Sequence, residues 1–132
     1  MDPRRPRRPH HVLIAEDSDD LRALWRTCLT HSGFTVEEAR NGQEALEKAR
    51  AHTPDVIVMD CCMPVLDGLS AMLQIRRDPA LTNVPMVALS AASAHTGAQA
   101  VKAGCDAFLA KPVMPDQLIE RVQVLLRATK DH

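Results

Sequence analysis

Five short apolar runs alternate with segments of helical periodicity, and this alternation limits what the 132-residue chain can fold into more than any other feature. In each intervening segment apolar residues recur every three or four positions, as on the buried face of a helix. Apolar strands joined by helical crossovers are typical of a parallel sheet that is covered on both faces. We therefore predict one α/β domain, a three-layer sandwich of five helices around five parallel strands: VLIA (12–15), FTVEEA (34–39), VIVM (56–59), MVAL (86–89) and AFLA (107–110).

Local signals mark where the predicted helices begin and end. Ser18 is a candidate cap for the first helix, and Gly33 is the residue expected to stop it. Asn41 is followed three residues later by Glu44, which resembles a capping box at the start of the second helix. Pro115 suits the first turn of the last helix. The run at 34–39 alternates apolar and polar residues, which predicts a half-exposed strand at the edge of the sheet.

The N-terminal residues differ in composition from the rest of the chain. Residues 1–9 carry four Arg and one Asp, a charge of +3, which leaves −4 for the remainder of a chain with a total of −1. Three prolines stand among these arginines, so residues 1–10 are predicted to form an extended, solvated leader. Contact with a nucleic acid or an anionic surface is the alternative role. The folded domain is predicted to span 11–129, with a short tail at 130–132.

Composition argues against several classes of protein. The chain has three aromatic residues, Trp25, Phe34 and Phe108, too few for a surface that stacks on bases. No apolar stretch approaches the roughly 20 residues of a membrane span, and no signal-peptide segment follows the arginines, so we expect a cytoplasmic protein. The four cysteines show no CxxC spacing, and the adjacent pair Cys61 and Cys62 is poorly placed for a disulfide bond.

Chemically distinctive residues occur where the predicted strands end. Glu16 and Asp17 follow the first strand, and the third, fourth and fifth strands end at Asp60, Ser90 and Lys111. The strands of a parallel sheet end along one edge, and open α/β sheets bind their ligands beyond this edge. We therefore expect these five side chains to converge.

The stretch DVIVMDCCMPVLDG (55–68) allows three interpretations: a redox or metal site on Cys61 and Cys62, a nucleophilic carboxylate at Asp60, or a strand that simply runs into a loop. Convergence of three carboxylates favours the second. A hard cation such as Mg²⁺ relieves their repulsion and leaves positions open for phosphate oxygens. A carboxylate can form a covalent aspartyl phosphate, whose oxygens the ammonium and hydroxyl groups of the last two strands can neutralise and hydrogen-bond.

Five stretches of the chain follow one another in a recognisable order and spacing: VLIAEDSDDLR, NGQEALEKA, PDVIVMDCCMPVLDG, VPMVALSA and AGCDAFLAKPV. Together they resemble the receiver domain of bacterial two-component response regulators. The resemblance covers residues 12–128. It implies a flavodoxin-like sheet with strand order 2-1-3-4-5 and a protein that is a signalling phospho-acceptor, not a conventional enzyme, taking part in its own phosphorylation and dephosphorylation.

Carried over by position, the resemblance makes Asp60 the phospho-acceptor. It implies that Mg²⁺ is held by Asp17, Asp60 and the backbone carbonyl of Cys62, with Glu16 acting through water, and that Lys111 contacts the phosphoryl group. Two positions depart from the common pattern. Glu16 stands where Asp is more frequent, and Cys62 lies where side chains influence access of the hydrolytic water.

The resemblance also implies a switch. Ser90 would contact the phosphoryl group and act as the switch hydroxyl, and Phe108 would be the rotating aromatic residue, without the hydroxyl of the more frequent Tyr. The Lys111–Pro112 bond would be cis, well above the base rate for such bonds. Phosphorylation would change the protein contacts of the face formed by the fourth helix, fifth strand and fifth helix.

The implied phosphoryl donor is a sensor histidine kinase or a histidine phosphotransfer protein, and the downstream protein target is not identified. Because four residues follow position 128, we expect no DNA-binding output domain in this chain and a stand-alone receiver, either monomeric or a weak phosphorylation-dependent dimer. A receiver-fold binding module that works without phosphorylation is the alternative. A flavodoxin-type site would suffer from phosphate repulsion by EDSDD, and a haloacid-dehalogenase-type phosphatase would need an acid in place of Cys62.

Overall fold

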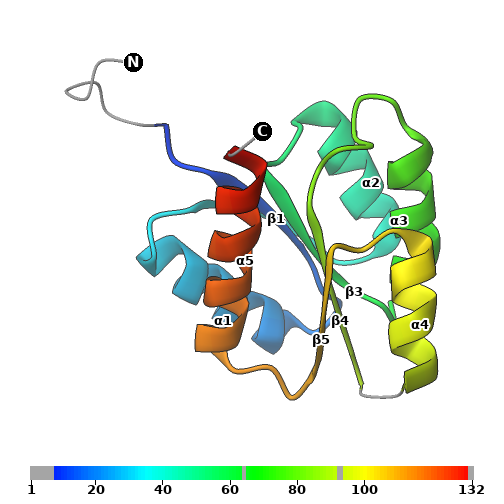
Figure 1. Ribbon diagram of the computed structural model, residues 1–132. Helices are drawn as coiled ribbons and strands as arrows, with labels where there is room; N and C mark the ends of the chain where they lie inside the picture. Colours follow the sequence, from blue (N-terminus) through cyan, green and yellow to red (C-terminus); the bar gives the residue numbers. More distant parts are fainter. Residues whose placement is uncertain (1–7, 64, 92–93, 131–132) are drawn as a thin grey trace.

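The computed structural model describes residues 8–63, 65–91 and 94–130, so residues 1–7 of the predicted leader and residues 131–132 of the predicted tail lie outside it. None of the helices in these ranges combines the length and hydrophobicity needed to cross a bilayer. Strands and helices alternate along the chain (Figure 1), with the bounds β1 (His11–Ala15), α1 (Asp19–His31), β2 (Thr35–Ala39), α2 (Gly42–Ala51), β3 (Val56–Asp60), α3 (Gly68–Arg77), β4 (Met86–Ala91), α4 (Ala94–Ala103), β5 (Ala107–Lys111) and α5 (Pro115–Lys130).

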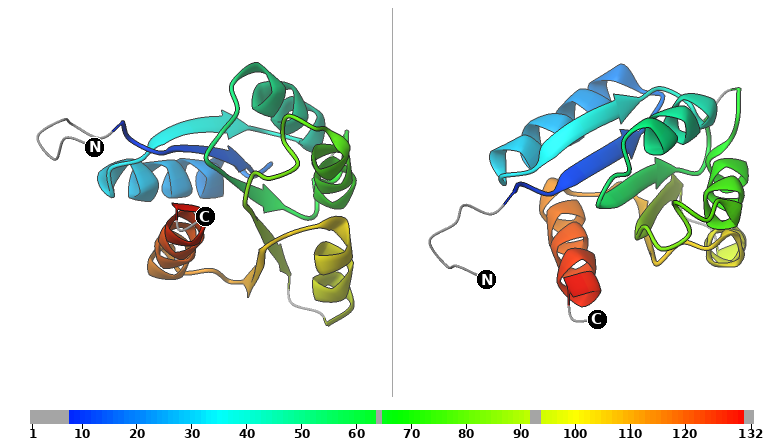
Figure 2. Two further views of the ribbon diagram at one scale, coloured as in Figure 1. Left: turned by 45° about the horizontal axis from the view of Figure 1, so that its top comes forward. Right: turned by 90° about the horizontal axis from the view of Figure 1, so that it is seen from above.

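The five strands form one parallel sheet in the order β2-β1-β3-β4-β5, which confirms the predicted order and places β2 at an edge. Helices α1 and α5 cover one face, and α2, α3 and α4 cover the other (Figure 2). From β1 the chain forms β2 on one side and then crosses to β3 on the other. The strand order therefore reverses between β1 and β3, the point at which such sheets bind ligands beyond the strand ends.

The core consists of two apolar clusters, one on each face of the sheet. In β1, Leu13 and Ala15 belong to the cluster under α2, α3 and α4, whereas Val12 and Ile14 belong to the cluster under α1 and α5. All four residues are fully buried. A slip of one residue would exchange the faces of every side chain in a strand, so burial on both faces fixes the register and, with it, the positions of the strand ends.

The first three helices begin at side-chain caps. Ser18 caps α1 and Asn41 caps α2, as predicted, and Asp67 caps α3. In each case the cap accepts a hydrogen bond from the N–H of the third helical residue, at 3.3, 2.8 and 2.9 Å respectively. The carboxylate of Glu44, the expected second partner in a capping box, lies 3.2 Å from the ammonium of Lys48. These caps fix where the chain leaves the rim of the sheet.

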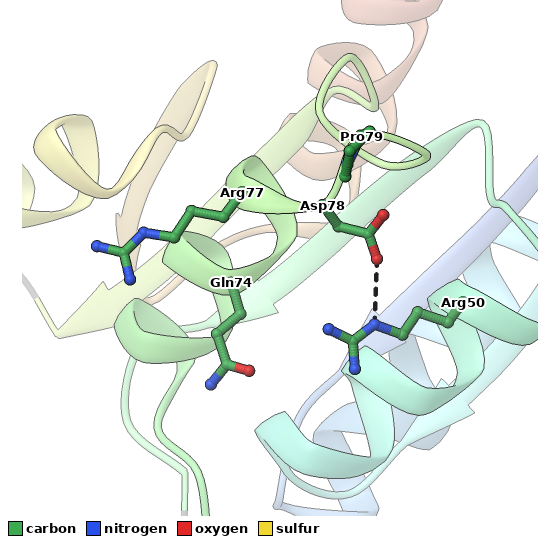
Figure 3. Close-up of a pocket in the computed structure, with 5 residues that line it drawn as sticks. All are labelled: Arg50, Gln74, Arg77, Asp78 and Pro79. Carbon is green, nitrogen blue, oxygen red and sulfur yellow. Dashed lines mark hydrogen bonds and ion pairs between the residues drawn. The ribbon is translucent and has the colours of Figure 1, made fainter.

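At the opposite end from the strand tips, an ion pair joins the last turn of α2 to the end of α3. Arg50 Nε lies 3.1 Å from Asp78 Oδ2, and the Arg77 side chain points away from this pair (Figure 3). The Asp78 carboxylate also accepts a hydrogen bond of 2.9 Å from the N–H of Ala80. That bond and the Arg50 guanidinium lower the pKa of Asp78. The pair borders a hollow of about 450 Å³ lined by Arg50, Gln74, Arg77, Asp78 and Pro79.

Candidate functional site

The register of the sheet brings four chemically distinctive residues to one edge. Glu16 directly follows β1 and Asp60 ends β3, and the pairing of the residues that precede them sets the two side by side. Ser90 lies one position beyond the β4 partner of Asp60, and Lys111 ends β5. Lys111 and Glu16 are 95 positions apart in sequence, yet their side chains meet.

Asp60 is a buried carboxylate paired with an ammonium group. Only 2% of Asp60 is exposed, and its Oδ2 lies 3.0 Å from Lys111 Nζ. Burial alone would lower the pKa of Lys111, but the hydrogen bond and charge of Asp60, together with Glu16, raise it above its usual value. Lys111 therefore stays protonated and directs a fixed positive charge at the acid.

Glu16 is the second buried acid, 1% exposed. Its Oε1 lies 3.5 Å from Lys111 Nζ, and its Oε2 accepts a hydrogen bond of 3.1 Å from the N–H of Ser18. Burial raises the pKa of Glu16 to about 7; the Ser18 N–H lowers it and neighbouring Asp60 raises it further. One ammonium group thus serves two carboxylates that repel each other.

Glu16, Asp17 and Asp60 form a cluster in which one oxygen of each carboxylate lies within 4.8 Å of the others. Glu16 and Asp60 are buried and Asp17 is exposed, so the cluster is reachable from solvent on one side. This all-oxygen set, buried on one side and exposed on the other, suits Mg²⁺, which takes carboxylate ligands and keeps several waters. The residues present therefore fit a hard divalent cation.

Cys61 and Cys62 differ sharply although they are neighbours. Cys61 is buried, and burial raises the pKa of its thiol to about 12. Cys62 is exposed, and its backbone N–H donates a hydrogen bond of 3.1 Å to Asp60 Oδ1. All four cysteines are free thiols, and the burial of Cys61 withholds from this pair the accessible, low-pKa thiolate that redox chemistry uses. The contribution of Cys62 to the site in this structure is a backbone contact to the acid.

The remaining predicted residues lie on β4 and β5 and just beyond. Ser90 is buried, 2% exposed, in β4. Phe108 of β5 is partly buried against the cluster under α2, α3 and α4, and its ring lies 3.6 Å from where a Cβ on Gly97 of α4 would be. The Lys111–Pro112 peptide bond is cis.

Two glycines allow close backbone approaches to the loop between β3 and α3. A Cβ on Gly68 would lie 1.9 Å from the carbonyl oxygen of Asp60. A Cβ on Gly42 would lie 2.1 Å from the carbonyl oxygen of Leu66, which accepts a hydrogen bond of 2.9 Å from the Gly42 N–H. Within this loop Val65 has a φ of 69°. The backbone after Asp60 is therefore held by two close contacts that only glycine allows, one at Gly68 and one at Gly42.

Arg22 is a site-associated residue that sequence patterns alone do not single out. It lies in the first turn of α1, and its Nη1 donates a hydrogen bond of 2.8 Å to the backbone carbonyl of Glu16. The available signal is its place in EDSDDLR, where it is the first cation after four acids. On a helix surface such a charge is commonly solvated, so the sequence does not indicate an inward contact.

The chain matches the response regulator receiver domain over residues 12–123, and it therefore belongs to this family of signalling phospho-acceptors. Among curated relatives, the polar-differentiation response regulator DivK of Brucella anthropi is 33% identical over 89% of this chain and 97% of its own length. The chemotaxis protein CheY of Bacillus subtilis is 32% identical over 89% and 98%. The transcriptional regulatory protein PrrA of Mycobacterium tuberculosis is 42% identical over 88% of this chain, which spans 49% of that protein.

Solved structures give the same family. The receiver domain of the Francisella response regulator 1452 is 35% identical, with a TM-score of 0.85 over 91% of this chain and 98% of its own. The receiver domain of the sensor histidine kinase PA1611 from Pseudomonas aeruginosa is 30% identical, with a TM-score of 0.84 over 91% and 99%. That structure contains a magnesium ion coordinated in its active-site cleft.

Proposed function

We propose that this chain is a phosphorylation-driven switch of two-component signalling and that Asp60 is its phospho-acceptor. The observation that supports this most directly is the contact of 3.0 Å between the buried Asp60 carboxylate and Lys111, beside two further acids. Phosphoryl transfer needs mainly a positioned nucleophile and neutralised oxygens. A buried carboxylate with an adjacent ammonium group, and with two further acids that can hold a divalent cation, meets both needs.

In the proposed reaction, a carboxylate oxygen of Asp60 attacks the phosphorus of a phosphohistidine on a kinase or phosphotransfer protein. A P–O bond forms as the P–N bond breaks, and the imidazole leaves with the electron pair and is protonated from solvent. Lys111 neutralises a phosphoryl oxygen. Asp17, Asp60 and the backbone carbonyl of Cys62 would hold Mg²⁺, with Glu16 through water, and the bound ion would supply the remaining positive charge.

The test is phosphorylation by a small donor. Wild-type protein and an Asp60→Ala variant are incubated with acetyl phosphate and MgCl₂, and their intact masses are compared. The wild type should gain about 80 Da, the mass of one phosphoryl group, and the variant should not. An Asp17→Asn variant keeps the acceptor and should be modified slowly at low Mg²⁺. No mass gain in the wild type, or an equal gain in Asp60→Ala, would contradict the assignment.

We further propose that phosphorylation is read through Ser90 and Phe108. Ser90 would turn toward the phosphoryl group and Phe108 would follow, changing the face of α4, β5 and α5 that meets a downstream protein in the cytoplasm. The chain would act as a monomer or a weak phosphorylation-dependent dimer. A pull-down with protein loaded with a phosphoryl mimic should capture partners that unloaded protein does not. Identical captures, and normal function of Asp60→Ala in cells, would favour a phosphorylation-independent module.

A further inference from the structure

Arg22 of α1 is a charged side chain that the fold buries, with 11% of the side chain exposed. Burying a guanidinium group is costly unless its N–H groups find partners. Arg22 has partners on three segments. Its Nη1 bonds the carbonyl of Glu16 at 2.8 Å, its Nε lies 3.4 Å from a carboxylate oxygen of Glu38 in β2, and its Nη2 pairs with Asp19.

These contacts make Glu16 a residue whose backbone is held on both sides. Its N–H donates a hydrogen bond of 3.0 Å to the carbonyl of Ala39, and its carbonyl accepts from Arg22. That carbonyl belongs to the peptide that joins Glu16 to Asp17. Arg22 therefore fixes the peptide between two of the three clustered acids, and so the direction in which both carboxylates leave the backbone.

The negative charge of the loop explains why the bond from Arg22 to its backbone matters. Residues 16–20 read EDSDD and carry four acids, and two of them belong to the cluster with Asp60. Like charges at this spacing repel and push a loop outward. A guanidinium group bonded to the loop backbone opposes that movement without occupying the carboxylate oxygens needed by a cation.

A neighbouring arginine supplies a matched comparison. Arg26 lies one helical turn further along α1, and its Nη1 is 3.3 Å from the same Glu38 carboxylate. Its side chain is 50% exposed. Arg26 contacts Glu38, whereas Arg22 contacts both Glu38 and the backbone of Glu16. Comparing the two arginines separates the contact with Glu16 from the general effect of a cation on this face of α1.

We propose that Arg22 is a positioning residue that holds Glu16 and Asp17 in the geometry that binds a divalent cation beside Asp60. This inference rests on the proposed function. Arg22 does not touch the reacting atoms; it acts through the backbone of the acidic pair. Residues that orient metal ligands in this way commonly set metal affinity by about 10- to 100-fold.

The test compares Arg22→Met, Arg26→Met and wild-type protein by calorimetric titration with MgCl₂. Arg22→Met should bind Mg²⁺ about 10- to 100-fold more weakly, whereas Arg26→Met should bind it as the wild type does. At saturating Mg²⁺ the rate of phosphorylation by acetyl phosphate should recover in Arg22→Met, because the acceptor itself is intact. In metal-free protein, amide hydrogen exchange at residues 16–18 should be faster in Arg22→Met alone.

Each alternative result has a definite meaning. Wild-type Mg²⁺ affinity in Arg22→Met, or an equal loss in Arg26→Met, would overturn the proposal. If Arg22→Met does not fold, Arg22→Lys keeps the charge without the forked geometry, and wild-type affinity in that variant would equally overturn it. If wild-type protein binds no Mg²⁺, the proposed function fails, and exchange at residues 16–18 in metal-free protein still decides whether Arg22 holds the loop.

Discussion

Gly68, which has no Cβ, packs directly against the backbone at the end of β3. The Gly68 N–H donates a hydrogen bond of 3.2 Å to the carbonyl of Cys61, and a Cβ would lie 1.9 Å from the carbonyl oxygen of Asp60. Real Cβ atoms do not approach backbone atoms so closely, so one of the two segments would have to move. Because Asp60 is the last residue of the strand, its carboxylate would move with it.

We expect Gly68→Ala to lower the free energy of unfolding by about 1–3 kcal/mol, the usual cost of overpacking. Urea unfolding followed by the fluorescence of Trp25, the only tryptophan, measures it. Gly97→Ala is the matched control, since its nearest neighbour is the Phe108 ring at 3.6 Å, and removing a helical glycine should raise stability by up to about 1 kcal/mol. Equal effects of the two variants would disprove the steric explanation.

Val65 carries backbone strain on the surface. Its φ of 69° is unfavourable for a β-branched residue, and 82% of it is exposed, so little packing compensates. Asn tolerates this conformation, and Val65→Asn should therefore raise the free energy of unfolding by about 1 kcal/mol. The same exchange at exposed Val124 of α5 should not stabilise, because Asn is no better than Val in a helix. A lower urea midpoint for Val65→Asn would refute the strain argument.

The neighbouring thiols should react very differently with iodoacetamide. A pKa of about 12 leaves about one Cys61 thiol in ten thousand as thiolate at pH 8, and burial also blocks the reagent. Cys62 is exposed and should be alkylated. Of these two neighbours, tandem mass spectrometry of the peptide after brief treatment of native protein should locate the label on Cys62 and not on Cys61, and urea-unfolded protein should carry it on both. Rapid native labelling of Cys61 would show that the end of β3 opens readily.

Among the secondary-structure elements, α2 and α3 are joined by a pH-sensitive contact. The folded-state pKa of Asp78 lies below its usual value because of the Ala80 N–H and Arg50. An acid of this kind stabilises the fold above its unfolded pKa of about 4 and loses this contribution as pH falls through its folded pKa. Asp78→Asn should therefore lower the urea midpoint at pH 7 and have little effect near pH 2.

The exposure of this ion pair keeps the expected effect small. Arg50→Met measures how much of the stability lost in Asp78→Asn comes from the ion pair with Arg50, because the hydrogen bond from the Ala80 N–H does not need Arg50. The double variant should then be close to Asp78→Asn alone. A pH-independent loss in Asp78→Asn would assign the effect to the local packing of this side chain and not to its ionisation.

For the whole molecule, cation binding and folding should be linked. A ligand that binds only the folded state stabilises it by RT ln(1 + [L]/Kd), about 1.4 kcal/mol at ten times Kd. MgCl₂ should therefore raise the melting temperature more than NaCl of equal ionic strength does, and EDTA should reverse the rise. Asp17→Asn removes one clustered acid and should respond less to Mg²⁺. An equal response to both salts would argue against a cation site.

Periodicity predicts the parallel sheet and the shared edge at which Asp60 and Lys111 lie, because apolar strands with crossovers run parallel and end along one edge. The strand order and the contact of Lys111 at the acceptor site were implied by the resemblance to receiver domains. Other features depend on how elements pack against each other. The φ of Val65 follows from the path between β3 and α3, and the role of Arg22 follows from the approach of β2 to α1. Neither leaves a periodic trace in the sequence.

The ammonium group of Lys111 comes from a later part of the chain than the acids with which it pairs. The acids come from β1 and β3, and the strand that carries Lys111 is an edge strand that pairs with β4 alone. A chain synthesised from its N-terminus therefore contains the three clustered acids before it contains Lys111. Until β5 docks, the carboxylates lack the ammonium group that pairs with them, so the complete arrangement of acids and ammonium group exists only in molecules whose last strand is in place.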